Sequence, residues 1–157
     1  LKSNQNWYYQ KQGQLVQNAW VKDNGNWYFM NDKGVMFNQT WLYQGDSWYA
    51  FKSSGAMISA DWLYDNGSWY YLKASGSMAT GWLKDGGTWY YLKASGSMAT
   101  GWVKDNGSWY YLKDSGAMAT GWIKDNGKWY YLASSGNMFS NTHTPDGYYV
   151  DASGVWK

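Results

Sequence analysis

The chain lacks cysteine, arginine and glutamate, and it contains one proline and one histidine. Without cysteine it can form neither a disulfide nor a thiol nucleophile. Without glutamate, a hydrolase that needs two carboxylates would depend on aspartate alone. The single histidine, His143, lies in an irregular segment, and the sequence has no phosphate-binding loop, metal cluster or nucleophile elbow. These absences predict a chain that is not an enzyme and needs no metal or cofactor.

Charge and hydropathy exclude two further classes of partner. All 13 cationic side chains are lysine and all 11 anionic ones are aspartate, which gives a net charge of +2. A charge this small does not predict a nucleic-acid partner. No apolar run approaches the ~20 residues that cross a bilayer, so membrane insertion is not expected. No signal peptide is visible, and Leu1 begins inside a repeat, which suggests a fragment of a longer chain.

Aromatic residues are abundant instead. They make up 22% of the chain, with 14 Trp and 16 Tyr, and glycine is also frequent at 19 residues. Tryptophan is large and rarely fully buried, so many of these rings are expected at the surface or in clefts.

A repeat of 20 or 21 residues accounts for this composition. Residues 81–100, 101–120 and 121–140 follow the pattern GWxKDxGxWYYLxxSGxMxT closely, and looser copies precede them. Two tryptophans, seven residues apart, mark each copy. We therefore predict a single module over residues 1–157: a partial repeat at 1–19, six full repeats at 20–140 and a degenerate repeat at 141–157.

Each repeat is predicted to be a β-hairpin. Asn106-Gly107 is a strong two-residue turn signal, because both central positions of a type I′ turn need a positive φ. Centring the turn there pairs Asp105 with Ser108, Lys104 with Trp109, Val103 with Tyr110 and Trp102 with Tyr111. Because side chains alternate between faces along a strand, both tryptophans then lie on one face and Tyr110 lies on the other.

One repeat tests this register because its glycine comes one residue early, in Gln44-Gly45-Asp46-Ser47. A turn centred on Gly45-Asp46 keeps the pairing of the other repeats, and a leading glycine indicates type II′. A one-residue slip would instead place Trp41 and Trp48 on opposite faces.

A second turn follows each hairpin, with a glycine such as Gly116 and a methionine two residues later, such as Met118. One 20-residue hairpin cannot bury its own apolar face, so neighbouring hairpins must stack. We therefore predict an all-β chain, an elongated β-solenoid of stacked ~20-residue hairpins with equivalent clefts between neighbours.

The clefts are predicted to be aromatic cages. The tyrosine directly after the second tryptophan is constant, points away from its own tryptophan pair and can face the pair of the preceding hairpin. The resulting cages are Trp20, Trp27 and Tyr49; Trp41, Trp48 and Tyr70; Trp62, Trp69 and Tyr90; Trp82, Trp89 and Tyr110; Trp102, Trp109 and Tyr130; and Trp122, Trp129 and Tyr149. Met98 and Met118, between the hairpins of the Trp82 and Trp102 cages, are expected to form their apolar floors, and Met57, Met78 and Met138 are expected to do so elsewhere.

A quaternary ammonium ion suits such a cage, because it has no N–H to donate and is attracted to the faces of aromatic rings. A purely structural role is the plainer alternative; it accounts for Leu72, Leu92, Leu112 and Leu132 but poorly for two tryptophans on one face, since aliphatic residues fill a core more readily. Carbohydrate binding is a second alternative, although sugar hydroxyls require directional polar partners that are scarce around the tryptophan pair.

The repeat pattern closely resembles the choline-binding repeats of pneumococcal surface proteins and cell-wall hydrolases. The resemblance implies a left-handed β-solenoid that binds choline or phosphocholine of teichoic and lipoteichoic acids. It also implies a secreted protein held non-covalently at the bacterial cell wall, with any catalytic domain elsewhere in the full protein. Related aromatic repeats in glucan-binding regions and clostridial toxins keep the carbohydrate alternative open.

The two ends depart from the pattern. The first repeat lacks its first tryptophan, so Trp7 with Tyr28 is expected to make an incomplete site. In the last repeat, Thr142 and Tyr148 replace both tryptophans. Val155-Trp156 is expected to act as a cap or a contact surface, and self-association through a terminal repeat is a further expectation.

Overall fold

The computed structural model describes residues 1–3 and 5–157 as short β-strands joined by turns, with no helix among them. That part of the chain accordingly has no helix long and apolar enough to span a bilayer. The prediction of an all-β chain of repeated hairpins is therefore confirmed. The chain divides into two compact units, Leu1–Ala79 and Thr80–Lys157. A single module over residues 1–157 stays a prediction.

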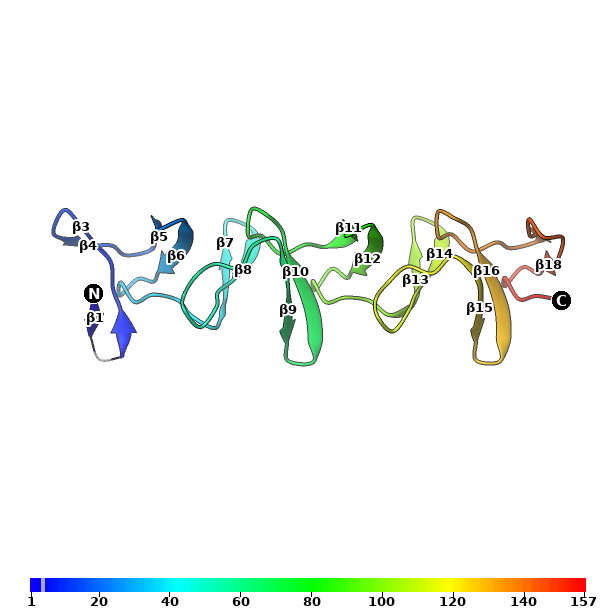
Figure 1. Cartoon of the computed structure of the whole chain (residues 1–157), viewed down its shortest axis with the longest axis horizontal. Helices are drawn as coiled ribbons and strands as arrows, with labels where there is room; N and C mark the ends of the chain where they lie inside the picture. The colour runs from blue at the N-terminus through cyan, green and yellow to red at the C-terminus, as the bar shows by residue number, and fades with distance from the viewer. Residues whose placement is uncertain (4) are drawn as a thin grey trace. The chain divides into compact units, whose positions relative to one another are not determined.

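The described residues of the first unit form ten strands, which pair in sequence order as five antiparallel hairpins (Figure 1). They are β1 (Lys2–Ser3), β2 (Asn6–Trp7), β3 (Gln10–Lys11), β4 (Gln14–Leu15), β5 (Ala19–Asp23), β6 (Asn26–Met30), β7 (Trp41–Gln44), β8 (Ser47–Ala50), β9 (Asp61–Asp65) and β10 (Ser68–Leu72).

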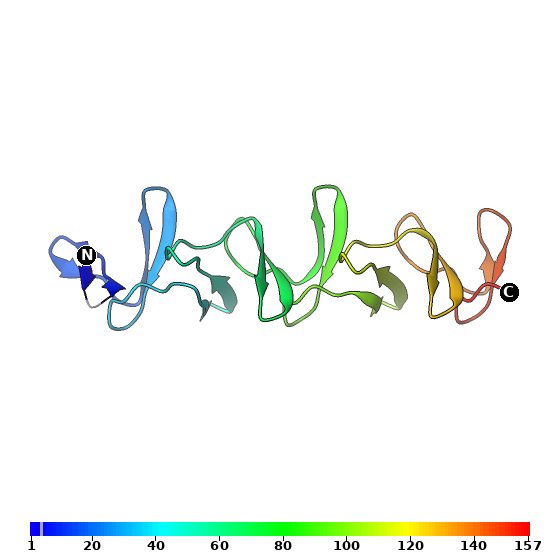
Figure 2. The same cartoon turned by 60° about the horizontal axis from the view of Figure 1, so that its bottom comes forward.

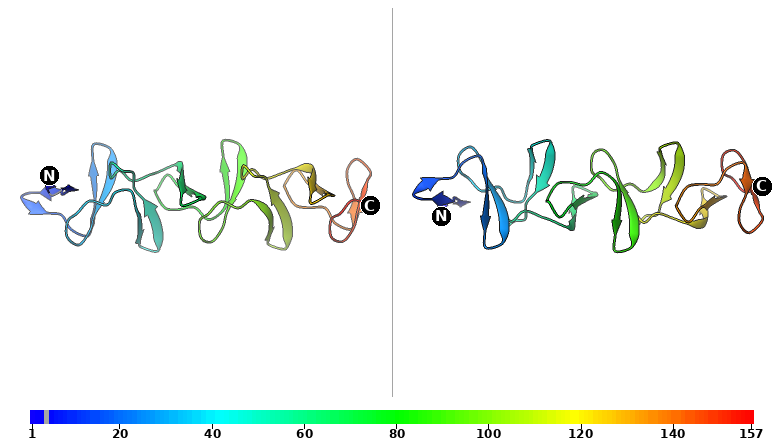
Figure 3. Two further views of the ribbon diagram at one scale, coloured as in Figure 1. Left: turned by 90° about the horizontal axis from the view of Figure 1, so that it is seen from below. Right: turned by 90° about the horizontal axis from the view of Figure 1, so that it is seen from above.

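The second unit repeats this arrangement in four hairpins. Its strands are β11 (Gly81–Asp85), β12 (Thr88–Leu92), β13 (Gly101–Asp105), β14 (Ser108–Leu112), β15 (Gly121–Asp125), β16 (Lys128–Leu132), β17 (Thr142–His143) and β18 (Tyr149–Val150). Within each unit, successive hairpins point in different directions (Figures 2 and 3). Each hairpin is thus a separate two-stranded sheet, and the sheets of a unit do not merge into a larger one.

The predicted strand register is confirmed. In β13 and β14, Trp102 pairs with Tyr111 and Lys104 pairs with Trp109. The turn residues Asn106 and Gly107 have φ values of 50° and 85°, as a type I′ turn requires. The turn chemistry therefore fixes which side chains share a face.

The hairpin with the early glycine keeps the same register, since Trp41 pairs with Ala50 and Tyr43 pairs with Trp48. The predicted type II′ turn is wrong, however. Gly45 and Asp46 both have positive φ, 58° and 66°, which is the type I′ pattern. Aspartate tolerates the left-handed region better than most residues, so it can occupy the second central position.

Within each unit, the second turn of a repeat connects it to the repeat before. The Met118 N–H donates a hydrogen bond to the Trp89 carbonyl at 2.8 Å, and the Met138 N–H donates likewise to Trp109. The residue that ends each long hairpin of the second unit is completely buried, at Leu92, Leu112 and Leu132. The leucines expected in the core are therefore there, and Leu72 is equally buried in the first unit.

Glycine at the second turn is required by both backbone and packing. Gly116 has a φ of +89°, and a Cβ atom built on it would lie 2.3 Å from the Met98 sulfur. The methionine of one repeat therefore packs directly on the bare Cα of the next glycine.

We predict that Gly116→Ala lowers the free energy of unfolding by about 2–4 kcal/mol, because a left-handed backbone strain adds to a steric clash. Gly107→Ala is the matched control: it has a similar φ of +85°, but nothing lies within 4 Å of the added Cβ. It should cost only about 1–2 kcal/mol. Urea denaturation measures both, and equal losses would show that the contact with Met98 contributes nothing.

Candidate functional site

Three aromatic rings from two successive hairpins surround a cavity in the second unit. Trp82 and Trp89 from the first of these hairpins have ring centroids 6.4 Å apart and planes at 85°. Tyr110 from the next hairpin lies 4.8 Å from the Trp82 ring. Together with Met118 and Ser135 they line a cavity of about 260 Å³. The structure thus brings together the three rings that the sequence predicts to meet.

Strand alternation explains this arrangement. The two tryptophans share one face of their hairpin because of the register, whereas Tyr110 pairs with Val103 and projects from the opposite face of its own hairpin. Trp89 keeps 40% of its surface exposed, which is unusual for a ring whose role is to fill a core. The purely structural alternative therefore does not account for this tryptophan.

The same group of rings recurs along both units. In each group, two tryptophan rings lie at nearly the same centroid distance, and the first tryptophan also lies close to the tyrosine of the next hairpin. The groups, with the Trp–Trp and then the Trp–Tyr centroid distance, are Trp20, Trp27 and Tyr49 (6.5 and 5.0 Å), Trp41, Trp48 and Tyr70 (6.4 and 5.2 Å), and Trp102, Trp109 and Tyr130 (6.4 and 4.9 Å). We call each such group a three-ring site. Because Trp62 and Trp69 belong to the first unit and Tyr90 to the second, that cage stays a prediction.

The methionine floor comes from one repeat further along the chain than the sequence indicates. The cavity at Trp82 and Trp89 is lined by Met118, not by Met98. Likewise, Met57 lines the cavity of about 340 Å³ at Trp20, Trp27 and Tyr49. The reason is the backbone bond between repeats: Met118 is tied to the carbonyl of Trp89, and Met78 is tied to that of Trp48.

The last site of the second unit differs from the sequence-based choice of Tyr149. Tyr148 lies 6.0 Å from Trp122, whereas Tyr149 contacts the ring of His143. The cause is the length of the terminal repeat, since Gly154 follows Gly136 by 18 residues instead of 20. Counted back from Gly154, Tyr148 holds the position that Tyr130 holds before Gly136.

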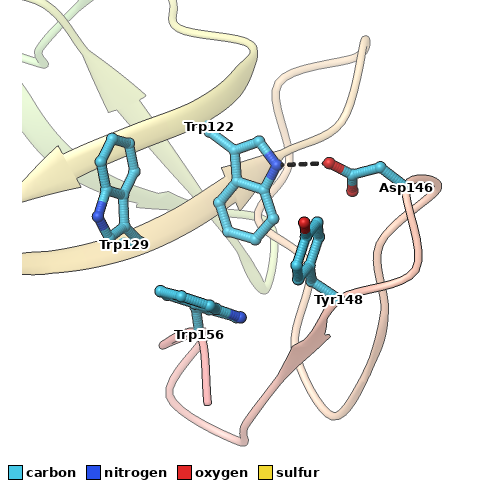
Figure 4. A pocket seen from close by; sticks show the side chains of 5 residues that line it. All are labelled: Trp122, Trp129, Asp146, Tyr148 and Trp156. Atoms are coloured by element: carbon cyan, nitrogen blue, oxygen red, sulfur yellow. Dashed lines mark hydrogen bonds between the residues drawn. The ribbon is translucent and has the colours of Figure 1, made fainter.

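The same count explains Trp156, which was expected to act as a cap or a contact surface. It stands two residues after Gly154, as Met138 does after Gly136. The backbone N–H of Trp156 donates a hydrogen bond to the Trp129 carbonyl at 2.9 Å. Trp156 therefore replaces the methionine floor. Figure 4 shows its ring closing the space between Trp129 and Tyr148. We call this group, Trp122, Trp129, Tyr148 and Trp156, the four-ring site.

At the other end, Trp7 and Tyr28 line a cavity of about 390 Å³ together with Leu1 and Met36. The Met36 N–H donates to the Trp7 carbonyl at 2.9 Å, which is the same link between repeats as elsewhere. The first tryptophan of a three-ring site has no counterpart in the first repeat, in agreement with the incomplete site predicted from the sequence.

An aspartate of the next hairpin holds the first tryptophan of several sites. The indole N–H donates to a carboxylate oxygen in the pairs Trp41–Asp65 (3.1 Å), Trp82–Asp105 (3.1 Å), Trp102–Asp125 (3.0 Å) and Trp122–Asp146 (2.9 Å). Sequence reasoning missed this role, because the aspartates of the Asp-Asn-Gly turns were fully explained by turn chemistry. Their recurrence one repeat after a tryptophan was the available signal.

The outer face of the second tryptophan carries one of two kinds of side chain. The ammonium groups of Lys22, Lys84, Lys104 and Lys124 lie 5.8–5.9 Å from the ring of the tryptophan that each pairs with. In two repeats a tyrosine stands there instead: Tyr43 stacks on Trp48 at 5.1 Å, and Tyr64 lies 5.0 Å from Trp69. The sites thus share the rings that line the cavity and differ in the side chain, lysine or tyrosine, that lies against the second tryptophan.

The pKa values of three groups in the second unit are shifted, two of them by local hydrogen bonds near the end of the chain. A hydrogen bond from the Thr144 hydroxyl, followed by that from Trp122, lowers the pKa of Asp146. The Ser153 hydroxyl and then the Val155 backbone N–H lower the pKa of Asp151 to about 2. Burial, and then the charge of Asp125, raises the pKa of Tyr111. Both carboxylates are therefore anionic at neutral pH, close to the four-ring site.

In the part of the chain that the structure describes, no group of three or more His, Cys, Asp or Glu side chains lies close enough together to hold a metal ion. His143 is exposed and contacts Tyr149. The chemistry that the sites offer is thus that of aromatic faces with an apolar floor.

Two models of known protein families match the repeats. A family model described as choline-binding repeat matches residues 64–101 and 99–143. A second, described as putative cell wall binding repeat, matches residues 18–36 and 39–57. No curated protein sequence matches the chain.

Solved structures from Streptococcus pneumoniae are also similar. CbpJ is 42% identical with a TM-score of 0.90, and the match covers 100% of this chain and 57% of that one. Choline binding protein F is 41% identical with a TM-score of 0.86, covering 100% and 56%. The choline-binding domain of CbpL is 38% identical with a TM-score of 0.77, covering 100% and 95%. The chain thus spans little more than half the length of the first two.

We predict that Asp125→Ala releases the Trp102 indole. Its N–H signal in a ¹H–¹⁵N NMR spectrum should move upfield and exchange with solvent faster, because the acceptor at 3.0 Å is gone. Asp114→Ala is the control, since it removes a carboxylate from an adjacent turn. A Trp102 signal that stays unchanged in Asp125→Ala would show that the carboxylate does not hold the ring.

Proposed function

Because the chain belongs to the family of choline-binding repeat proteins, we propose that it is a cell-wall attachment module that binds choline in the cavities between successive hairpins. The ligands would be choline residues of teichoic and lipoteichoic acids. The module would be non-catalytic, and the protein would be secreted and held at the wall without a covalent bond. Within each unit, we further propose that the hairpins follow a left-handed β-solenoid.

The observation that carries this proposal is the three-ring site itself. Two indole faces at 85° and a phenol face enclose a cavity in which Met118 is the apolar floor. A trimethylammonium group is attracted to several ring faces at once and needs no hydrogen-bond acceptor. Each ring contributes ~0.5–2 kcal/mol. Since millimolar affinity corresponds to ~4 kcal/mol, three rings support weak binding by one site.

The number of repeats compensates for this weakness. A polymer that carries many choline groups can occupy several sites at once, and each later contact is intramolecular. Overall affinity can then exceed that of one site by ~10²–10⁴ without a new kind of contact. Free choline occupies sites without bridging them, so concentrated choline should compete with the polymer.

We predict that choline quenches or shifts the tryptophan fluorescence saturably, whereas glucose oligomers at equal concentration do not. The reason is that the partly exposed ring of Trp89 faces a cavity in which Ser135 is the one residue with a polar side chain beside the rings and Met118. A fluorescence titration with both ligands measures this. A response to the oligomers without one to choline would favour the carbohydrate alternative.

We also predict that Trp89→Ala removes one choline site and leaves distant sites intact, because contacts between repeats are made between nearest neighbours. Calorimetry should give a stoichiometry lower by about one, since one cage of the array is lost. Lys93→Ala, a change on the exposed second turn of the same repeat, is the control. An unchanged stoichiometry in Trp89→Ala would mean that this tryptophan pair serves packing alone.

A further inference from the structure

The four-ring site is a different kind of site from the others in its unit. Where each regular repeat places a methionine, the terminal repeat places Trp156. Its ring lies 6.0 Å from that of Tyr148 at 87°, and Tyr148 lies 6.0 Å from Trp122 at 81°. The corresponding distance in the three-ring sites of this unit is 4.8–4.9 Å. The rings therefore stand further apart and are one more in number.

The cavity is correspondingly larger. It measures about 400 Å³, against about 260 Å³ for the cavity at Trp82 and Trp89. The aspartate does not distinguish the two sites, since Asp146 accepts a hydrogen bond from Trp122 as Asp105 does from Trp82. A cation placed between the four rings thus gains an additional aromatic face (Figure 4).

The backbone that carries the additional ring is held in place. The Trp156 backbone N–H donates to the Trp129 carbonyl, and Trp156 bridges to Val150, which is fully buried. The turn before it is fixed by Asp151, whose carboxylate accepts hydrogen bonds from the N–H groups of Ser153 and Val155. A backbone that is already ordered loses little freedom on binding, which lowers the entropic cost of using this ring.

The charged side chains named around the site balance, and the one that lines the cavity is anionic. Asp146 borders the cavity, and its carboxylate is bonded to the Trp122 indole. Lys124 lies behind Trp129, 5.9 Å from its ring. Lys157 forms an ion pair of 3.4 Å with Asp151, so that its charge is locally balanced.

From these observations we propose that Trp156 determines the specificity of the four-ring site, which binds quaternary ammonium ions bulkier than choline more tightly than the three-ring sites of the same unit do. The proposal rests on the proposed function, because it assumes that these cavities hold quaternary ammonium groups. The physical cause is the wider spacing of the rings together with a fourth aromatic face. Methionine at the same position provides dispersion contacts but no ring face.

The test uses the full chain labelled with 5-fluorotryptophan and ¹⁹F NMR. Trp156→Met and Trp89→Phe each remove one signal and so assign Trp156 and Trp89. Tetraethylammonium, the bulky probe, should shift the Trp156 signal at a concentration about tenfold lower than it shifts the Trp89 signal. Choline, titrated in parallel, should shift both signals.

Trp156→Met should abolish the preference, which can then be followed on the Trp122 signal, assigned with Trp122→Phe. Trp156→Phe retains an aromatic ring and should keep most of the preference, which separates an effect of the ring from an effect of size. Because methionine is the residue of the regular repeats, Trp156→Met should fold, and thermal unfolding checks this.

Three outcomes would overturn the proposal. Tetraethylammonium could shift Trp89 and Trp156 at the same concentration, or the preference could survive in Trp156→Met. In either case choline would still shift both signals, and the proposed function would stand. If choline shifted neither signal, the proposed function would fail, and the proposal would fail with it.

Discussion

A hairpin of about 20 residues is too small to bury its own apolar side chains, and this constraint governs the whole chain. Each hairpin is completed by the next one. The Met118 N–H bonds to the Trp89 carbonyl of the preceding hairpin, and the Met98 side chain packs on Gly116 of the following repeat. The cavities are a consequence of this dependence. Their walls come from two successive repeats because no single repeat is complete.

The tryptophan pair adds a second requirement, because a ring that must bind a ligand cannot be fully buried. Trp109 keeps 40% of its surface exposed, and a neighbouring group has to fix the orientation of its partner. Asp125 of the next hairpin does so for Trp102 through a hydrogen bond of 3.0 Å. The aspartate is thus both a hairpin residue and a support for the preceding site. The rings are thereby ordered before a ligand binds, which lowers the entropic cost of binding.

Much of this arrangement could be predicted from the sequence, because short-range rules determine it. The Asn106-Gly107 turn fixes the pairing of Trp102 with Tyr111, and strand alternation then directs Tyr110 toward the preceding tryptophan pair. The same rules kept the register around Gly45 but gave the wrong turn type, because they do not weigh how well aspartate adopts a positive φ.

The features that sequence reasoning missed depend on contacts between repeats. The floor at Trp82 is Met118, because the second turn reaches back across a whole hairpin. Tyr148 replaces Tyr149 because the terminal repeat is shorter and is aligned from its glycine, not from its first strand. No pattern within a single repeat contains this information. Comparing each repeat backward from its second glycine would have recovered both Tyr148 and Trp156.

Because each site is made by two neighbours only, the sites can differ without disturbing the fold. Gln44 stands where the other long hairpins have aspartate, and the preceding Trp20 contacts Phe51 at 5.8 Å. Tyr43 replaces the lysine behind Trp48, and Trp156 replaces a methionine. A repeat therefore keeps the residues that set its register and turns, while the residues that face or back the cavity vary. An array of this kind can combine sites of unequal strength and selectivity on one scaffold, and the terminal repeat is where the departure is largest.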